Sequence, residues 1–175
     1  MNLQYIQLPD FLIVDLYKNS LVIVNDQQKL EKIPTEPEKL TTTRQWYLGS
    51  NLQKITLIVC EKEAVYLQDD SLQFLSAILG ACKLHIGDVA IVNYHHDPVS
   101  YTFLKEALSP DFILLFGVSA KQIQIPFTVP NYQVQQHDNC SFLLAASLVN
   151  MLGTSQEAKL EKSKLWLSLK KMFNV

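Results

Sequence analysis

The stretch KITLIVC, residues 54–60, is the part of the sequence that decides the fold. An unbroken run of β-branched and other apolar residues is typical of a strand covered on both faces, as in a parallel sheet. Two similar runs follow, DVAIVNY at 88–94 and DFILLFG at 111–117. Between them lie SLQFLSAILGACKL (71–84) and PVSYTFLKEAL (98–108), whose apolar residues recur at helical spacing. Strand, helix, strand, helix, strand predicts an α/β fold with a mostly parallel central sheet.

The ends of these elements can also be predicted. Ser71 is expected to cap the first helix, and Asp97, just before Pro98, to begin the second. Ser155 is expected to cap a final helix that ends near Phe173. The segments KQIQIPF (121–127) and NYQVQQH (131–137) alternate polar and apolar residues, which predicts half-exposed strands near an edge of the sheet.

The N-terminal quarter differs from the rest. Residues 9–18 predict a short helix and 21–24 a short strand. Residues 25–44 are polar, hold two prolines and show no sustained period, so we expect a long, partly mobile surface loop there. At 175 residues the chain is long enough for one α/β domain with a sizeable core, and we predict a single domain over 1–175.

Composition excludes several classes of protein. The formal charge of −2 disfavours extensive nucleic-acid binding, which depends on a basic excess that neutralises phosphates. Three cysteines in a chain of this size do not form a disulfide framework. The first residues lack the pattern of a signal peptide, and no apolar run approaches the length that spans a bilayer. We expect a cytoplasmic protein that is not bound to a membrane.

Two adjacent histidines, His95 and His96, follow the second strand. Ligands bind at the carboxyl ends of parallel strands, so a functional role is one interpretation. Adjacent side chains of an extended segment point to opposite faces, however, which argues against joint binding of one metal. A solvated loop that leads into the next helix is the alternative that we favour.

Other polar residues give weaker hypotheses. His137 and Cys140 have ligand-like spacing, but no second pair completes a tetrahedral site, so we predict no metal and no cofactor. Glu61 and Glu63 follow the first strand, where a general base could lie. The loop that carries them has no glycine or proline to bring backbone close to a ligand, and carboxylates in a solvated loop are the simpler interpretation.

The ordered set of segments resembles the uracil-DNA glycosylase superfamily, and within it the non-catalytic psi-subunit family of bacterial DNA polymerase III. The late pattern of a glycine-ended strand, Ser147-Leu148 and a helix with Lys-x-x-Leu-Trp-x-x-Leu carries this likeness. The resemblance covers roughly the last two-thirds of the chain and implies a three-layer α/β fold. The segments that carry it are 55–60, 69–79, 88–94, 112–117, 142–152 and 162–172.

The resemblance also shows which catalytic features are missing. Active glycosylases of this superfamily have a Gly- and Pro-containing loop after the first strand, where this chain has EKEAVY (61–66). They carry a His-Pro-Ser loop before the last helix, where this chain has Ala145-Ala146-Ser147. Alanine side chains cannot stabilise developing charge on a departing base. The resemblance therefore implies a non-enzymatic protein. The alternative is a divergent base glycosylase that uses Glu61 or Glu63 with His95 or His96.

If the chain acts as psi-like proteins do, its function lies in protein contacts. The resemblance implies a tether to the clamp loader and a docked small replication subunit; homodimerisation is a further alternative. The N-terminal segment is rich in large apolar groups that could anchor a partner, although packing on the chain's own sheet is the interpretation that we favour. The predicted partner-binding residues are Phe11, Leu12, Ile13 and Tyr17.

Overall fold

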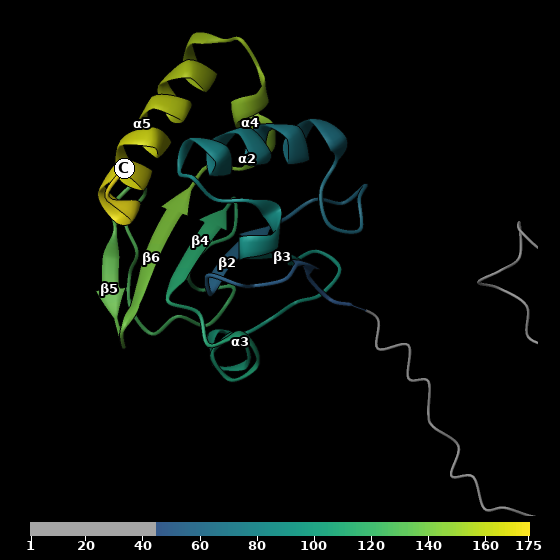
Figure 1. The fold of residues 1–175 in the computed structure, drawn as a ribbon, viewed down its shortest axis with the longest axis vertical. Helices are drawn as coiled ribbons and strands as arrows, with labels where there is room; N and C mark the ends of the chain where they lie inside the picture. Colours follow the sequence, from purple (N-terminus) through teal and green to yellow (C-terminus); the bar gives the residue numbers. More distant parts are fainter. Residues whose placement is uncertain (1–44) are drawn as a thin grey trace, which may run out of the picture. The chain divides into compact units, whose positions relative to one another are not determined.

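The computed structural model describes residues 45–175 (Figure 1). These residues form six strands, four α-helices and a short 3-10 helix, η1. In chain order the elements are β1 (Leu48–Gly49), β2 (Ile55–Val59), α2 (Asp69–Ala81), η1 (Ile86–Asp88), β3 (Val89–Asn93), α3 (Tyr101–Leu108), β4 (Phe112–Phe116), β5 (Gln135–His137), β6 (Cys140–Ala145), α4 (Leu148–Leu152) and α5 (Gln156–Phe173).

One six-stranded sheet organises this part of the chain, with the strand order β1-β3-β2-β4-β6-β5. The four inner strands are parallel, and Leu57 of β2 lies between Ile91 of β3 and Leu114 of β4. The two outer strands, β1 and β5, run antiparallel to their neighbours. The predicted α/β fold with a mostly parallel sheet is confirmed. The continuous apolar runs were informative because every residue of β2 and β3 is buried.

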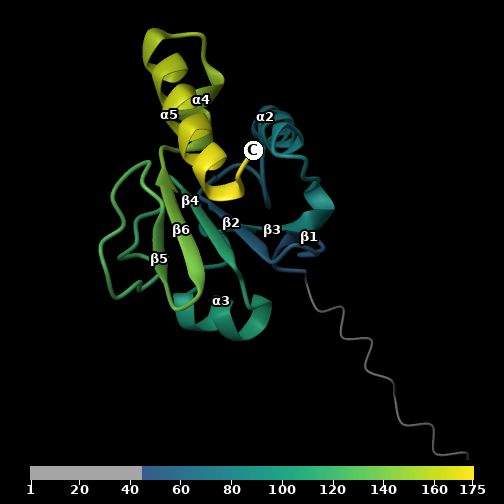
Figure 2. The same ribbon diagram turned by 60° about the vertical axis from the view of Figure 1, so that its left-hand side comes forward.

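Helices cover both faces of the sheet, as the two ribbon views show (Figures 1 and 2). Helices α2, α4 and α5 lie on one face, where Leu75, Leu148 and Leu165 pack against the strands. Helix α3 lies on the other face and contributes Leu104. Because alternate residues of a strand point to opposite faces, each inner strand supplies apolar side chains to both layers of core.

The predicted helix starts are partly wrong. Ser155 caps α5, since its hydroxyl accepts a hydrogen bond from the Ala158 N–H at 3.1 Å. Ser71 is not a cap: α2 begins two residues earlier, and Ser71 is buried in its first turn. Asp97 does not begin α3 either, because Ser100 is the N-cap and accepts from the Phe103 N–H at 3.3 Å.

One predicted strand is absent. Residues 121–127 form turns instead, with Gln124 at a φ of 59° and Pro126 unable to donate to a ladder. Ile123 and Ile125 alternate because both enter the core beside α3 from a loop. The second predicted edge strand exists, although only Gln135–His137 pair as β5.

The remaining N-terminal predictions lie outside the described residues. They are the helix at 9–18, the strand at 21–24, the loop at 25–44 and the partner-binding residues Phe11, Leu12, Ile13 and Tyr17. Within residues 45–175, no helix is long and apolar enough to cross a membrane.

Candidate functional site

The carboxyl ends of the parallel strands form the edge where α/β proteins place their ligands. Four residues mark this edge, each at the last position of a strand or within two residues after it: Glu61 after β2, Asn93 in β3, Gly117 after β4 and Ala146 after β6. This edge holds the predicted Glu61 and lies next to His95. It is therefore the first place to look for chemistry.

Asn93 uses its whole side chain to hold the loop between β2 and α2. Its amide nitrogen donates to the carbonyl oxygens of Glu61 (2.8 Å), Ala64 (2.9 Å) and Val65 (3.3 Å). Its side-chain oxygen accepts from the backbone N–H of Glu61 at 3.0 Å and of His95 at 3.2 Å. A buried amide with all of these partners is satisfied and has no remaining group to offer a substrate.

Both glutamates accept hydrogen bonds from Gln68, at the start of α2. Glu61 is 7% exposed, and its Oε2 accepts from the backbone N–H of Gln68, the N-cap residue of α2, at 2.8 Å. The exposed Glu63 accepts from the Gln68 side-chain amide at 2.9 Å. Oε1 of Glu61 is buried and has no hydrogen-bond partner among the described residues. The solvated-loop interpretation therefore holds for Glu63 and fails for Glu61.

His95 and His96 are exposed in the turn after β3. Their rings lie 5.1 Å apart at 83°, and the His96 N–H donates to the Asn93 carbonyl oxygen at 3.2 Å. Within residues 45–175, no hydrogen bond or ion pair joins either imidazole to Glu61 or Glu63. Asn93 brings the backbones of Glu61 and His95 together, but one side chain is buried and the other exposed.

The end of β6 is closed by backbone packing. Gly117 has a φ of 69°, and a Cβ added there would lie 2.8 Å from the Cβ of Ser147. The Ala146 N–H donates to the Tyr132 hydroxyl at 3.0 Å. Ser147 and the two alanines before it thus occupy a tight junction between β4, β6 and α4.

His137 and Cys140 lie in the hairpin that joins β5 to β6. These two residues pair across a two-residue turn, and Asp138 in the turn forms an ion pair with Lys105 of α3. Burial raises the pKa of the Cys140 thiol to about 12, with smaller contributions from Asp111 and Asp138. A thiol with this pKa stays protonated at neutral pH, which argues against a nucleophile. In the described part of the chain, no group of three or more His, Cys, Asp or Glu side chains could hold a metal.

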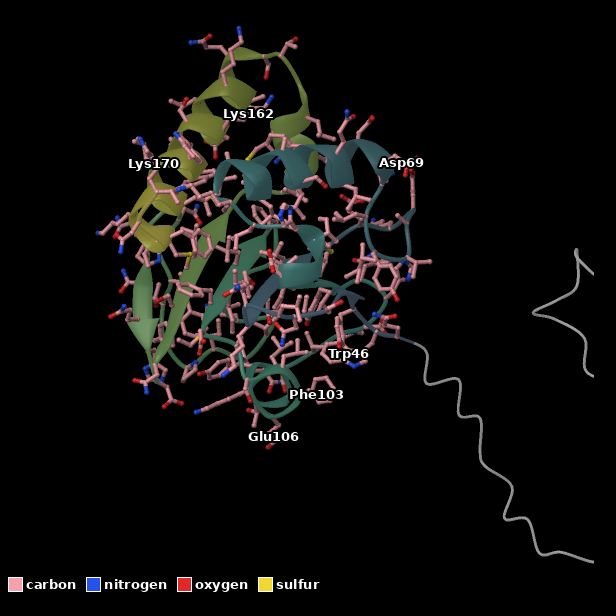
Figure 3. The ribbon with its side chains drawn as sticks, viewed as in Figure 1. Trp46, Asp69, Phe103, Glu106, Lys162 and Lys170 are labelled. Carbon is pink, nitrogen blue, oxygen red and sulfur yellow. The ribbon has the colours of Figure 1, made fainter. Side chains whose placement is uncertain are left out.

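An apolar groove between α2 and α5 was missed by sequence reasoning. It has a volume of about 260 Å³. Lys162 lies over the Phe74 ring with its Nζ 5.4 Å from the centroid, and Lys170 lies over Trp166 at 5.7 Å; both lysines are on α5 in Figure 3. The lining residues are Phe74, Ala77, Ile78, Ala81, Lys162, Leu165, Trp166 and Leu169.

Trp166 is partly buried. One part of its side chain packs against the core, and it also lines this groove. The signal that could have found the groove is the pair of small residues, Ala77 and Ala81, which lie four apart on α2 and leave room beside an aromatic residue.

Trp46 and Phe103 form a second apolar surface feature, with ring centroids 5.1 Å apart (Figure 3). Phe103 is 45% exposed on α3, on the opposite face of the sheet from the groove. The contact between these two rings packs the segment before β1 against α3. A structural role therefore explains why the two rings lie together, and no ligand is needed to explain it.

Comparison with known proteins does not identify a family for this chain. No family model matches the chain, and no curated protein is significantly similar to it in sequence.

Proposed function

We propose that this chain is a non-enzymatic, partner-binding subunit, a psi-like accessory protein of the DNA replication machinery that acts in the cytoplasm. The proposal gives it the uracil-DNA glycosylase-like version of the α/β fold. One observation carries the loss of catalysis: the polar groups at the carboxyl edge are mostly engaged in structural hydrogen bonds. Asn93 and Glu61 hold the loop before α2, and alanines occupy the last position of β6 and the position after it.

The open apolar surface supports the binding role. The groove between α2 and α5 presents two partly buried aromatic rings, Phe74 and Trp166, at the surface. Recognition of an amphipathic helix in such a groove is a recurrent mode of protein binding, and tryptophan is enriched among the residues that dominate it. We assign this groove to the docked small subunit, and the N-terminal segment with Phe11 and Leu12 to the clamp loader.

The test is binding of the purified full chain to purified clamp loader and to small replication subunits, measured by biolayer interferometry. We expect Phe11→Asp with Leu12→Asp to weaken clamp-loader binding more than tenfold, and Trp166→Ala to weaken small-subunit binding more than tenfold. Leu160→Asp is the matched control, because Leu160 is 54% exposed on α5 and does not line the groove. If the intact chain binds neither component, the proposal is wrong.

A divergent base glycosylase is the second candidate, favoured by the unpartnered, buried Oε1 of Glu61. Release of uracil from single-stranded DNA that Glu61→Gln abolishes would establish it. Glu63→Gln is the control, since the Glu63 carboxylate is exposed and bonded to Gln68. His95→Ala tests the proposed partner in the same assay. Light scattering distinguishes homodimerisation, the third alternative, from a monomer.

A further inference from the structure

A groove beside the outer strand β5 has a different character from the apolar one. It has a volume of about 440 Å³ and lies between β5, the residues that precede it, and α5. Strand β5 is the last strand of the sheet, as both ribbon views show (Figures 1 and 2). No described residue pairs with its outer edge. The groove is lined by Tyr132, Val134, Gln135, Lys164, Leu167 and Lys171, together with Gln133 and Ser168.

The hairpin geometry determines which backbone groups point outward. His137 and Cys140 flank the two-residue turn and form its closing pair. Hydrogen-bonded and non-hydrogen-bonded pairs alternate along antiparallel strands, so the N–H and C=O of Gln136 face away from β6. An edge of this kind is a template for an added strand. The strand edge beside the groove therefore offers the backbone groups of Gln136, in addition to the side chains that line the groove.

The wall opposite this edge is apolar in the middle and basic at both ends. Leu167 is 68% exposed and supplies the apolar part of this wall. Lys164 lies about one turn before it and Lys171 about one turn after it. Lys164 forms an ion pair with Glu161 at 2.9 Å, so its charge is already partly compensated, and the Tyr132 hydroxyl donates to the same carboxylate. Lys171 therefore supplies most of the free positive charge of this wall. Lys171 forms no ion pair with any described residue.

The spacing of these groups fits an extended chain. Lys164 and Lys171 are seven residues apart, or roughly 10 Å along a helix. In an added strand, side chains on one face recur every second residue, roughly 7 Å apart, so the first and fifth residues lie roughly 14 Å apart. The flexible four-carbon stems of the two lysines can bridge the difference of roughly 4 Å. An acidic residue, an apolar residue and a second acidic residue at alternate positions would meet Lys164, Leu167 and Lys171 in turn.

We infer that β5 and α5 form a docking site for an extended acidic segment of a protein partner, which adds to the sheet as a seventh strand. Charge selects this occupant over a second copy of the chain. Pairing of β5 with β5 of another copy would bring the lysines of both grooves to one interface, where like charges repel. The inference does not depend on the proposed replication role, because it uses only this edge and α5.

The probe is a fluorescein-labelled peptide with the sequence Glu-Thr-Val-Thr-Glu, titrated with the full chain and followed by fluorescence anisotropy. We expect saturable binding that weakens as salt is added. Lys171→Glu should weaken it about fivefold, in line with loss and reversal of an exposed charge pair. The same variant should gain affinity for Lys-Thr-Val-Thr-Lys. Lys159→Glu is the matched control, since Lys159 is exposed on α5 outside the groove.

Gln136→Pro tests the added strand itself. It removes an outward N–H and no ladder hydrogen bond, so the variant should keep its melting temperature and lose peptide binding. A peptide N-methylated at alternate residues should lose binding to the unchanged protein for the same reason. Absence of binding at 1 mM peptide, equal binding by Lys171→Glu, or a dimer that the peptide does not dissociate would each overturn the inference.

Discussion

Gly117 shows at the scale of one residue why the carboxyl edge of the sheet is closed. Its φ of 69° lies in the left-handed region, and a Cβ there would meet Ser147 at 2.8 Å. The junction of β4 with the start of α4 therefore depends on the absence of a side chain. Both the backbone conformation and the close contact with Ser147 favour glycine over any other residue at this position.

Gly117→Ala is accordingly expected to lower the free energy of unfolding by about 2–4 kcal/mol, from a left-handed alanine and from overpacking. Urea unfolding followed by circular dichroism measures it. Gly80→Ala is the matched control: Gly80 lies in α2 with no atom within 4 Å of an added Cβ, so the change should stabilise by up to about 1 kcal/mol. A loss below 1 kcal/mol at Gly117 would contradict the steric account.

Tyr132 shows at the scale of elements how the segment before β5 is fixed to α5. Its hydroxyl donates to Glu161 of α5 and accepts from the Ala146 N–H at 3.0 Å. Its carbonyl oxygen accepts from the Ser168 hydroxyl at 2.7 Å. One residue thus joins α5 to the end of β6. These hydrogen bonds add to the β-bridge between Asn131 and Leu144, in which the Tyr132 N–H donates to the Leu144 carbonyl oxygen at 2.8 Å.

This linkage makes stability depend on pH. Burial and the hydrogen bond to Glu161 raise the pKa of Tyr132 from 10.0 to about 12. The folded state holds the phenol neutral where the unfolded chain ionises it, so this contribution is complete below pH 10 and is lost as pH rises through about 12. The hydrogen bond from Tyr132 lowers the pKa of Glu161, and that contribution is lost only in acid.

Tyr132→Phe should therefore lower the free energy of unfolding by about 1.5–3 kcal/mol at pH 7, the range for a hydrogen bond to a charged group. The difference in the free energy of unfolding between this variant and the unchanged protein should become smaller between pH 10 and pH 12. Urea unfolding at pH 7, 9 and 11 measures both. A gap that stays constant over this range would show that the phenol titrates alike in the folded and unfolded states.

The elements that could be predicted from the sequence are those whose signal is local. Residues 54–60, 88–94 and 111–117 contain β2, β3 and β4 because burial on both faces leaves a continuous apolar run. The alternation at 121–127 misled because two isoleucines enter the core from turns. Helix starts were harder to predict, since the first turn of α2 is bonded by Glu61, seven residues before Gln68.

The candidate site was less predictable, for a physical reason. Asn93 and the carbonyl oxygens that it binds are about 30 residues apart in the chain, so no local pattern reveals that its amide is fully bonded. The apolar groove likewise combines Phe74 and Trp166, which only the packing of α2 beside α5 brings together. Spacing identified candidate residue types, while their partners depend on the tertiary fold.

At the scale of the described domain, the sheet is most protected at its centre and most open at its edges. Strands β2 and β4 pair with each other in the middle of the strand order, and Leu57, Ile58 and Leu115 are fully buried. The outer strands have only two and three residues, β1 and β5 respectively. Local opening should therefore be confined to the edges, where the proposed seventh strand would bind.

Native-state hydrogen exchange tests this distribution together with the effect of Gly117. Amides of β2 and β4 should exchange only through global unfolding, with the free energy that urea unfolding gives. The amide of His137, which pairs with Cys140 in the short β5–β6 ladder, should exchange through smaller fluctuations. Since Gly117 ends β4 and contacts the residue before α4, Gly117→Ala should lower the exchange free energies of β2 and β4 by the same amount as the urea value. The exchange free energy of His137 should be almost unchanged. If β4 alone lost protection, β2 and β4 would belong to separate cooperative units, and the six strands could not be treated as one core.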